Sequence, residues 1–451
     1  MKKILLVLAV FLSPSLSAQI DLDVVNNIRE QGFYNSQVMD TLQHLSDVIG
    51  SRLSGSPQLL AANNWTRDKL EQWGLENAHL EGFEFGRGWS YQSASIDLIA
   101  PRQTSFHGIP VAWTPGTDGS IEAELVYVDA VTASELQIYQ GQLRGKIVLL
   151  SDARDLGVPS NDVFVRRDSS DLRDLVEFEI DSGPSHRRAS AAGRDFSLQR
   201  YYFRRALSAF LLEEGALAGV MSSSRDGGLI NVFGFDHRPG NTFSIPTMII
   251  EAEQYNMIMR LIDLRQAPRL RINIAATFHD DDHQNYNTVA EIPGQGGTPE
   301  IVMVGAHLDS WHASTGSVDN GAGVAITMEA VRIPAALDIK PKRTIRIGLW
   351  AGEEQGLHGS YNYVKDHFVS RTEPLDEAER ALSHRLWSSP GWPIEKKEDY
   401  DRLSAYFNID NGSGRIRGIY TEGNVAVKPI FQSWFGPFSD LAASTITLRA
   451  T

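Results

Sequence analysis

The sequence predicts an α/β protein in which a mixed sheet flanked by helices carries an inserted β-rich module. Three continuous apolar runs, at 301–304, 344–351 and 405–409, lack the alternation of half-exposed strands and are typical of parallel strands buried on both faces. Helical patterns follow the first two runs, as strand–helix units require. Between 121 and 246 the pattern changes to short β runs, which indicates the insert.

The N-terminal segment has the pattern of a signal peptide. Lys2 and Lys3 precede an apolar run at 4–12, and small residues follow as far as Ala18. The run is shorter than the roughly 20 apolar residues that cross a bilayer. We therefore expect an exported protein, periplasmic or secreted, without a membrane span. The predicted parts are the signal peptide at 1–18, the first part of the main domain at 19–120, the insert at 121–246 and the rest of the main domain at 247–451.

The composition excludes nucleic acid as a partner and restricts the metal chemistry. The chain has 56 acidic and 42 basic side chains and a formal net charge of −14, so its surface repels nucleic acid. It has no cysteine, and neither disulfides nor thiolate ligands are available. Any metal must therefore be held by His, Asp and Glu.

Shorter patterns predict the elements around these strands. We expect a helix that carries Val38, Leu42, Leu45 and Val48, and a long charge-mixed stretch at 151–205 that forms a solvated loop or, as the alternative, a lid over substrate. The other expected elements are helices at 59–73 and around 207–211 and strands at 124–128, 146–150, 218–221 and 270–278.

Acidic residues and one histidine follow the three apolar runs. In an open α/β sheet, functional side chains collect at the carboxyl ends of the strands. Neutral imidazole with carboxylates is a ligand set that suits zinc. Two metal ions close together also need a bridging carboxylate and a free carboxylate that handles protons. The residues in these positions are His307, Asp309, Asp319 at a predicted helix start, Glu353, Glu354 and Asp410.

The order of these motifs resembles the co-catalytic zinc exopeptidases, the family of aminopeptidases and glutamate carboxypeptidases. The phrases at 307–311, 342–344 and 349–356 are similar to its carboxypeptidase Q branch. The resemblance implies a zinc-exopeptidase (phosphorylase/hydrolase-like) sheet, with 247–451 as the catalytic peptidase domain. The phrases at 145–150 and 214–220 resemble the protease-associated (PA) domain.

The resemblance also implies residue roles, two zinc ions per chain and a short peptide as substrate. His307 and Asp410 would hold one zinc, Glu354 the other, and Asp319 would bridge them. Glu353 would be the general base that takes a proton from the metal-bridging water and returns it to the leaving amine. The reaction type would be that of a dipeptidase or aminopeptidase, and a homodimer is left open.

Two further features, Asp309 and the C-terminal end, are compared with the zinc exopeptidase pattern. Asp309 would hydrogen-bond the far nitrogen of His307 and fix its tautomer. The family pattern also has a final histidine in a Thr-Asp-His setting, whereas no histidine follows His384. This difference predicts a chain that is truncated at its C-terminus and binds the second zinc weakly.

Two other functions are compatible with these residues. One is a non-catalytic binding protein that retains the peptidase fold, and the other is a single-zinc enzyme similar to glutaminyl cyclases. His312, in the loop after His307, could contact substrate or only solvate the loop, and the acidic cluster at 279–283 is expected to be an exposed turn. The sequence has no His-Glu dipeptide, which excludes HExxH proteases, and neither a G-x-S-x-G elbow nor a Walker A loop.

Overall fold

The computed structural model describes residues 20–157, 165–176, 191–410 and 414–449. The predicted signal peptide lies outside these residues, and export stays a prediction. Among the described helices, none is both long and apolar enough to cross a membrane. The chain divides into a larger unit, formed by Ser36–Arg166 and His186–Gly414, and a smaller unit, formed by Met1–Asn35, Arg167–Ser185 and Arg415–Thr451.

The larger unit contains a five-stranded mixed sheet that confirms the predicted α/β class. The three apolar runs form its strands β12, β11 and β15, of which β11 pairs in parallel with both of the others. Strand β10 runs antiparallel to β12 and β1. The order across the sheet is β1 (Glu76–Glu84), β10 (Gln284–Ile292), β12 (Thr344–Trp350), β11 (Ile301–His307) and β15 (Leu403–Asn408).

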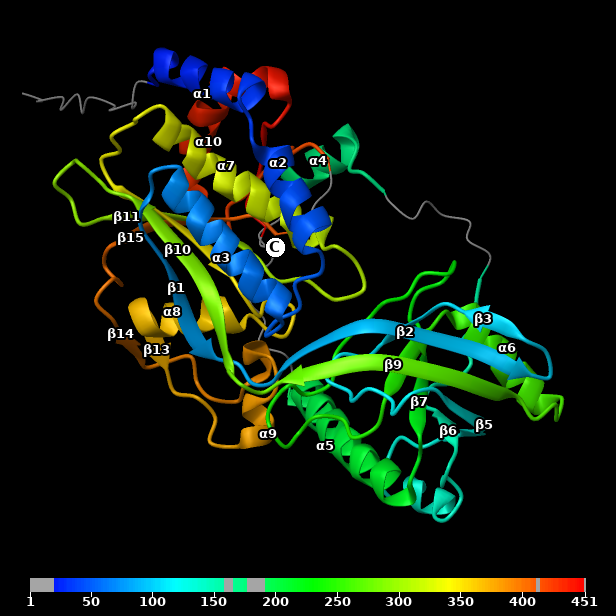
Figure 1. Ribbon diagram of the computed structural model, residues 1–451. Helices are drawn as coiled ribbons and strands as arrows, with labels where there is room; N and C mark the ends of the chain where they lie inside the picture. Colours follow the sequence, from blue (N-terminus) through cyan, green and yellow to red (C-terminus); the bar gives the residue numbers. More distant parts are fainter. Residues whose placement is uncertain (1–19, 158–164, 177–190, 411–413, 450–451) are drawn as a thin grey trace, which may run out of the picture. The chain divides into compact units, whose positions relative to one another are not determined.

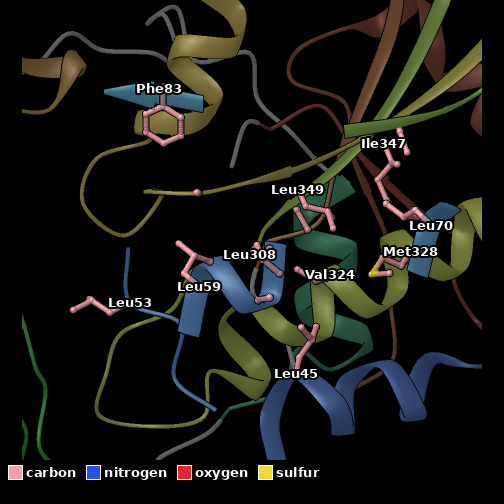
Figure 2. Packing of buried hydrophobic residues seen from close by; sticks show 14 of the residues in the cluster. Leu45, Leu53, Leu59, Leu70, Phe83, Leu308, Val324, Met328, Ile347 and Leu349 are labelled. Atoms are coloured by element: carbon pink, nitrogen blue, oxygen red, sulfur yellow. The ribbon is translucent and has the colours of Figure 1, made fainter. Parts of the chain in front are cut away.

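Helices cover both faces of this sheet. The helices α3 and α7 pack on one face, where Leu70, Met328 and Leu349 belong to one buried cluster (Figure 2). Helix α8 packs on the other face, where Tyr363 meets Trp350. Because apolar side chains are buried on both faces of the sheet, the strands are held in place, and the positions of their carboxyl ends are fixed. The helices are α2 (Val38–Gln43) with a π-helical turn (His44–Ile49), α3 (Pro57–Gln72), α7 (Ala322–Ala336) and α8 (His358–His367).

A second sheet of eight strands lies in the larger unit. Its two longest strands, β2 and β9, pair antiparallel (Figure 1), and β5 to β8 form a parallel core. This sheet draws strands from outside 121–246, and the PA-like assignment and the domain boundaries stay predictions. The order is β3 (Thr104–Phe106), β2 (Gly88–Ala100), β9 (Arg269–His279), β5 (Ile121–Tyr127), β6 (Ile147–Leu149), β7 (Ala218–Ser222), β8 (Thr247–Ile250) and β4 (Gly108–Pro110).

The stretch 151–205 differs from the expected solvated loop, because it contains helical residues. Helix α4 (Ser169–Val176) lies in it, and α5 (Ala191–Glu214) begins in it. One side of α5 is apolar: Leu211 is fully buried, and Phe203 and Leu207 pack against the same cluster. Burial of this side stabilises a helix whose charge content is typical of a solvated segment.

The remaining elements are short. In the larger unit they are helix α6 (Ala252–Asp263), the hairpin of β13 (Val369–Arg371) and β14 (Ile394–Lys396), helix α9 (Glu377–Arg380) and the helical turns Glu135–Tyr139 and His384–Leu386. In the smaller unit they are α1 (Leu22–Tyr34), the parallel pair β16 (Gly418–Tyr420) and β17 (Thr445–Thr447), α10 (Lys428–Phe435) and the helical turns Val425–Val427 and Gly436–Leu441.

Candidate metal centre

Three predicted ligands meet beyond the carboxyl ends of β11 and β15. His307 is the last residue of β11, Asp410 follows β15, and Asp319 lies in the turn Ser317–Gly321 that precedes α7. The Nε2 atom of His307 lies 3.0 Å from Oδ1 of Asp319 and 3.2 Å from Oδ1 of Asp410. The imidazole is 2% exposed, whereas the two carboxylates reach solvent. The site is therefore open on the side of the carboxylates.

These three residues fit a zinc ion by chemistry and by spacing. One ligand atom from each lies within 4.8 Å of the other two. Zinc binds imidazole nitrogen and carboxylate oxygen at about 2.0–2.2 Å, so two atoms on one ion are at most about 4.4 Å apart. A small closure of the group would bring all three atoms into contact with one cation. Glu354 is not part of this group.

The Glu353–Glu354 pair is positioned by a turn after β12. Gly352 has φ of +71°, a left-handed conformation that side chains other than glycine rarely adopt, and it starts this turn. The two glutamate N–H groups then donate to the Asp309 carboxylate, Glu353 to Oδ1 and Glu354 to Oδ2, each at 3.2 Å. The carboxylate of Asp309 thus fixes both catalytic candidates through their backbone.

The electrostatics of the group favour a bound cation. Burial raises the pKa of Glu353 to about 7 and that of Glu354 to about 8, and the nearby carboxylates of Asp309 and Asp319 add to both shifts. Burial lowers the pKa of His307, but hydrogen bonds to neighbouring carboxylates outweigh burial and raise it overall. Four or more acids around one imidazole need positive charge, which a divalent cation supplies.

The comparison with protein families gives the identity of this segment. Residues 287–428 match the model of peptidase family M28. This segment belongs to peptidase family M28. All five residues predicted as metal ligands or as general base lie in the M28 segment, and the predicted resemblance is confirmed.

A curated relative extends the similarity beyond the M28 segment. Carboxypeptidase Q of Mus musculus is 28% identical over 343 residues, which are 76% of this chain and 64% of that protein. The chain therefore spans less than two thirds of the length of this relative. Carboxypeptidase Q is what the chain is similar to, in agreement with the branch that its motifs indicate.

Solved structures of the M28 family share the fold. A peptidase M28 precursor from Shewanella amazonensis matches with a TM-score of 0.56 at 22% identity, covering 94% of this chain and 81% of that chain. A zinc aminopeptidase from Bacillus subtilis matches with a TM-score of 0.51 at 16% identity, covering 91% and 78%. At these identities the likeness shows the fold alone, a mixed sheet flanked by helices.

Asp309 has a wider set of contacts than the sequence predicts. The nearest acceptor for Nδ1 of His307 is the main-chain oxygen of Asp309 at 3.0 Å, and the carboxylate Oδ1 lies at 3.5 Å. Besides the two glutamate N–H groups, the carboxylate accepts a hydrogen bond from Ser54 Oγ at 3.0 Å. Ser54 was missed, because nothing in its local sequence links it to a strand end 255 residues away.

Arg52 is the second residue near the candidate metal centre that sequence reasoning missed. Its side chain is fully buried, and its guanidinium donates five hydrogen bonds to main-chain oxygens. Three of these acceptors, Leu308, Thr315 and Gly316, lie in the loop between His307 and Asp319. Burial lowers the pKa of Arg52 to about 10. This arginine therefore fixes the loop that separates two of the candidate ligands.

Two further predicted positions lie apart from the metal centre. His312 neither contacts the candidate ligands nor solvates the loop: it is 5% exposed, its Nε2 lies 2.7 Å from the Pro110 oxygen, and its ring edge meets Trp89. The cluster at 279–283 forms the connection between β9 and β10, as expected. Its Asp280 is ion-paired with Arg87 at 2.6 Å, and the cluster is not among the metal-ligand groups of the described residues.

Proposed function

We propose that this chain is a zinc-dependent exopeptidase that hydrolyses short peptides, as a dipeptidase or an aminopeptidase. The observation that supports it best is the convergence of His307, Asp319 and Asp410 within the M28 segment, beside the Glu353–Glu354 turn. The M28 segment and the fold shared with a zinc aminopeptidase suggest peptidase activity, and the proposal extends this activity to the whole protein.

The proposal gives each candidate residue a role. His307 and Asp410 would hold one zinc, and Asp319 would bridge to a second that Glu354 holds. When bound, zinc supplies a Lewis acid that polarises the scissile carbonyl and lowers the pKa of water. Asp309 positions His307 and the glutamate turn.

Proton transfer is assigned to Glu353. Its half-buried carboxylate takes a proton from the attacking water and delivers it to the nitrogen of the leaving amine, so that the proton balance closes in one turnover. A base works best when its pKa lies near the working pH, and burial moves the pKa of Glu353 to about 7.

The test is a Glu353→Gln variant compared with the wild-type chain on a panel of dipeptides. We expect kcat to fall by about 10²–10⁴-fold, because a general base contributes that much. Zinc content, measured by elemental analysis, should stay unchanged, because the amide replaces a group that is not a ligand. A variant that keeps the wild-type kcat would show that Glu353 is not the base.

The same measurements separate the two alternative functions. A binding protein that retains the fold would hydrolyse no dipeptide and hold no zinc. A single-zinc cyclase would hold one equivalent and release ammonia from peptides with N-terminal glutamine. Two equivalents of zinc with dipeptide hydrolysis support the proposed exopeptidase.

A further inference from the structure

A cavity of about 1120 Å³ in the larger unit reaches the turn that carries Glu354. Glu354, Gln355 and His358, from the turn after β12 and the start of α8, line it. Residues of α5 from the second sheet's region line it as well (Figure 1, green). A cube of this volume has sides of about 10 Å, which is the length of about three extended residues. The cavity is therefore large enough for a short peptide.

Helix α5 turns one polar face toward this cavity. The lining residues recur at intervals of three and four, which places them on one side of an α-helix. An adjoining side packs Phe203, Leu207 and Leu211 into an apolar cluster. The core contacts therefore fix which side chains face the cavity: Ser197, Arg200, Tyr201, Arg204, Arg205 and Ser208.

Three arginines of this face, Arg200, Arg205 and Arg204, have no acidic partner among the described residues, and the half-buried one of them is Arg204. Its side chain is half-buried, and among the described residues no carboxylate lies within ion-pair distance of it or of Arg200. Its guanidinium carbon lies 5.7 Å and 5.9 Å from the ring centres of Phe233 and Phe235. Burial, with a smaller effect of Arg200, lowers its pKa.

Other cations of the cavity wall are already engaged. Arg238 pairs with Asp236 at 2.6 Å, and Lys365 pairs with Glu373 at 2.6 Å. Arg204 is instead held against two aromatic rings, which orient a guanidinium without neutralising it. A half-buried cation without a counter-charge gains most from a ligand carboxylate, which a planar guanidinium can bind with two parallel hydrogen bonds.

We propose that Arg204, assisted by Arg200, binds a carboxylate group of the peptide in this cavity. The inference rests on the proposed function and deepens it, since it names the substrate class as short peptides with a free carboxylate. That carboxylate is either the C-terminal group or an acidic side chain. The first source makes the chain a dipeptidase or a short-peptide carboxypeptidase.

The test compares Arg204→Met and Arg204→Lys with the wild-type chain. Substrates are a neutral dipeptide with a free C-terminus, its C-terminal amide, and a pair of peptide amides that differ only by Glu or Gln. For the carboxylate-bearing substrate, Arg204→Met should raise KM about tenfold to a hundredfold, as expected for a lost charged hydrogen bond, with kcat nearly unchanged. Arg204→Lys should recover part of the loss.

The substrate pairs identify the source of the carboxylate. Sensitivity confined to the free C-terminus assigns the terminal group, and sensitivity confined to the Glu peptide assigns the side chain. The matched control Arg265→Met, at an exposed position outside the cavity lining, should leave every KM unchanged. Equal effects of Arg204→Met on charged and amidated peptides, or no effect, would overturn the inference.

A binding measurement keeps this inference separate from the proposed function. If the wild-type chain hydrolyses no peptide, the exopeptidase proposal fails, and calorimetry of the full chain with the free and amidated dipeptides still tests the carboxylate site. Tighter binding of the free dipeptide that is lost in Arg204→Met supports the site. Equal binding of the two dipeptides refutes it.

Discussion

Arg52 acts on the metal centre without touching it. Five main-chain oxygens from two separate segments, 45–50 and 308–316, depend on its one guanidinium. A lysine offers three donors from a single point and cannot reach the same set. The loop between His307 and Asp319 is therefore fixed by a residue that lies more than 250 positions earlier.

Substitution of Arg52 tests this positioning role. Arg52→Met removes five hydrogen bonds to main-chain oxygens, of which only those of Leu45 and Gly316 keep a backbone donor, and we expect the free energy of unfolding to fall by about 3 kcal/mol or more. Urea denaturation measures the loss. Zinc affinity, measured by competition with a chelator, should also weaken, since a looser loop separates His307 from Asp319. A variant with an unchanged urea midpoint would show that water replaces these hydrogen bonds.

At the level of elements, the site joins the end of β11 to the turn after β12. Asp309, two residues past β11, accepts the backbone N–H groups of Glu353 and Glu354. On the far side of that turn, Asn287 of β10 accepts from the Ala351 N–H at 3.1 Å and donates to the Gly359 oxygen at 3.0 Å. The turn is therefore held from both sides, by Asn287 of β10 and by Asp309 in the loop after β11, the two strands that flank β12.

A pair of substitutions measures how much this link contributes. Asp309→Asn exchanges an acceptor oxygen for an NH₂ group that faces backbone donors, and we expect kcat or zinc affinity to fall about 10–100-fold, as for other groups that support metal ligands. Ser54→Ala removes only one of the donors to Asp309, so its effect should be smaller than tenfold. Steady-state kinetics and zinc titration report the two effects. If kcat and zinc affinity are no lower in Asp309→Asn than in Ser54→Ala, the role given to the Asp309 carboxylate is wrong.

Elements differ in how well the sequence predicts them. The strands β11 and β12 were found because burial on both faces leaves an unbroken apolar run, a signal that is local in sequence. The end of helix α5 was predicted as the helix around 207–211, but its first part was missed, because its arginines, which line a cavity, make the composition of this part resemble that of a loop. Burial of Phe203, Leu207 and Leu211 against residues of other segments stabilises the helix over its longer extent.

At the scale of the whole molecule, the order of motifs predicted three side chains that the structure brings together, but not the residues that position them. His307, Asp319 and Asp410 converge because parallel strands bring their carboxyl ends to one edge of the sheet, a rule that sequence order can use. Arg52 and Ser54 act across more than 250 residues, and no periodicity or motif encodes such a contact. His312 is a polar loop residue, for which the sequence predicts contact with substrate or with solvent. In the structure it is instead buried against Trp89 of the second sheet.

The protons held by the site make the stability of the metal-free chain depend on pH. Glu353, with a pKa of about 7, and Glu354, with a pKa of about 8, stay partly protonated in the folded chain at neutral pH, whereas the unfolded chain ionises them near 4.5. The raised pKa of His307 acts in the same direction. Because the folded chain binds more protons, its stability falls as pH rises through these values.

We expect the chelator-treated full chain to lose roughly 0.5–1 kcal/mol of unfolding free energy per pH unit between pH 7 and 8.5, after allowance for solvent screening. Histidines whose pKa burial lowers, such as His312 and His384, are neutral in the folded chain and partly protonated in the unfolded chain near pH 7, so they oppose this slope only at the start of the window. Added zinc should flatten the dependence, because the cation replaces the bound protons. Urea denaturation at fixed pH values gives the slope, and Glu354→Gln should reduce it. A metal-free chain whose stability is constant or rises from pH 7 to 8.5 would show that these carboxylates are ionised without a cation.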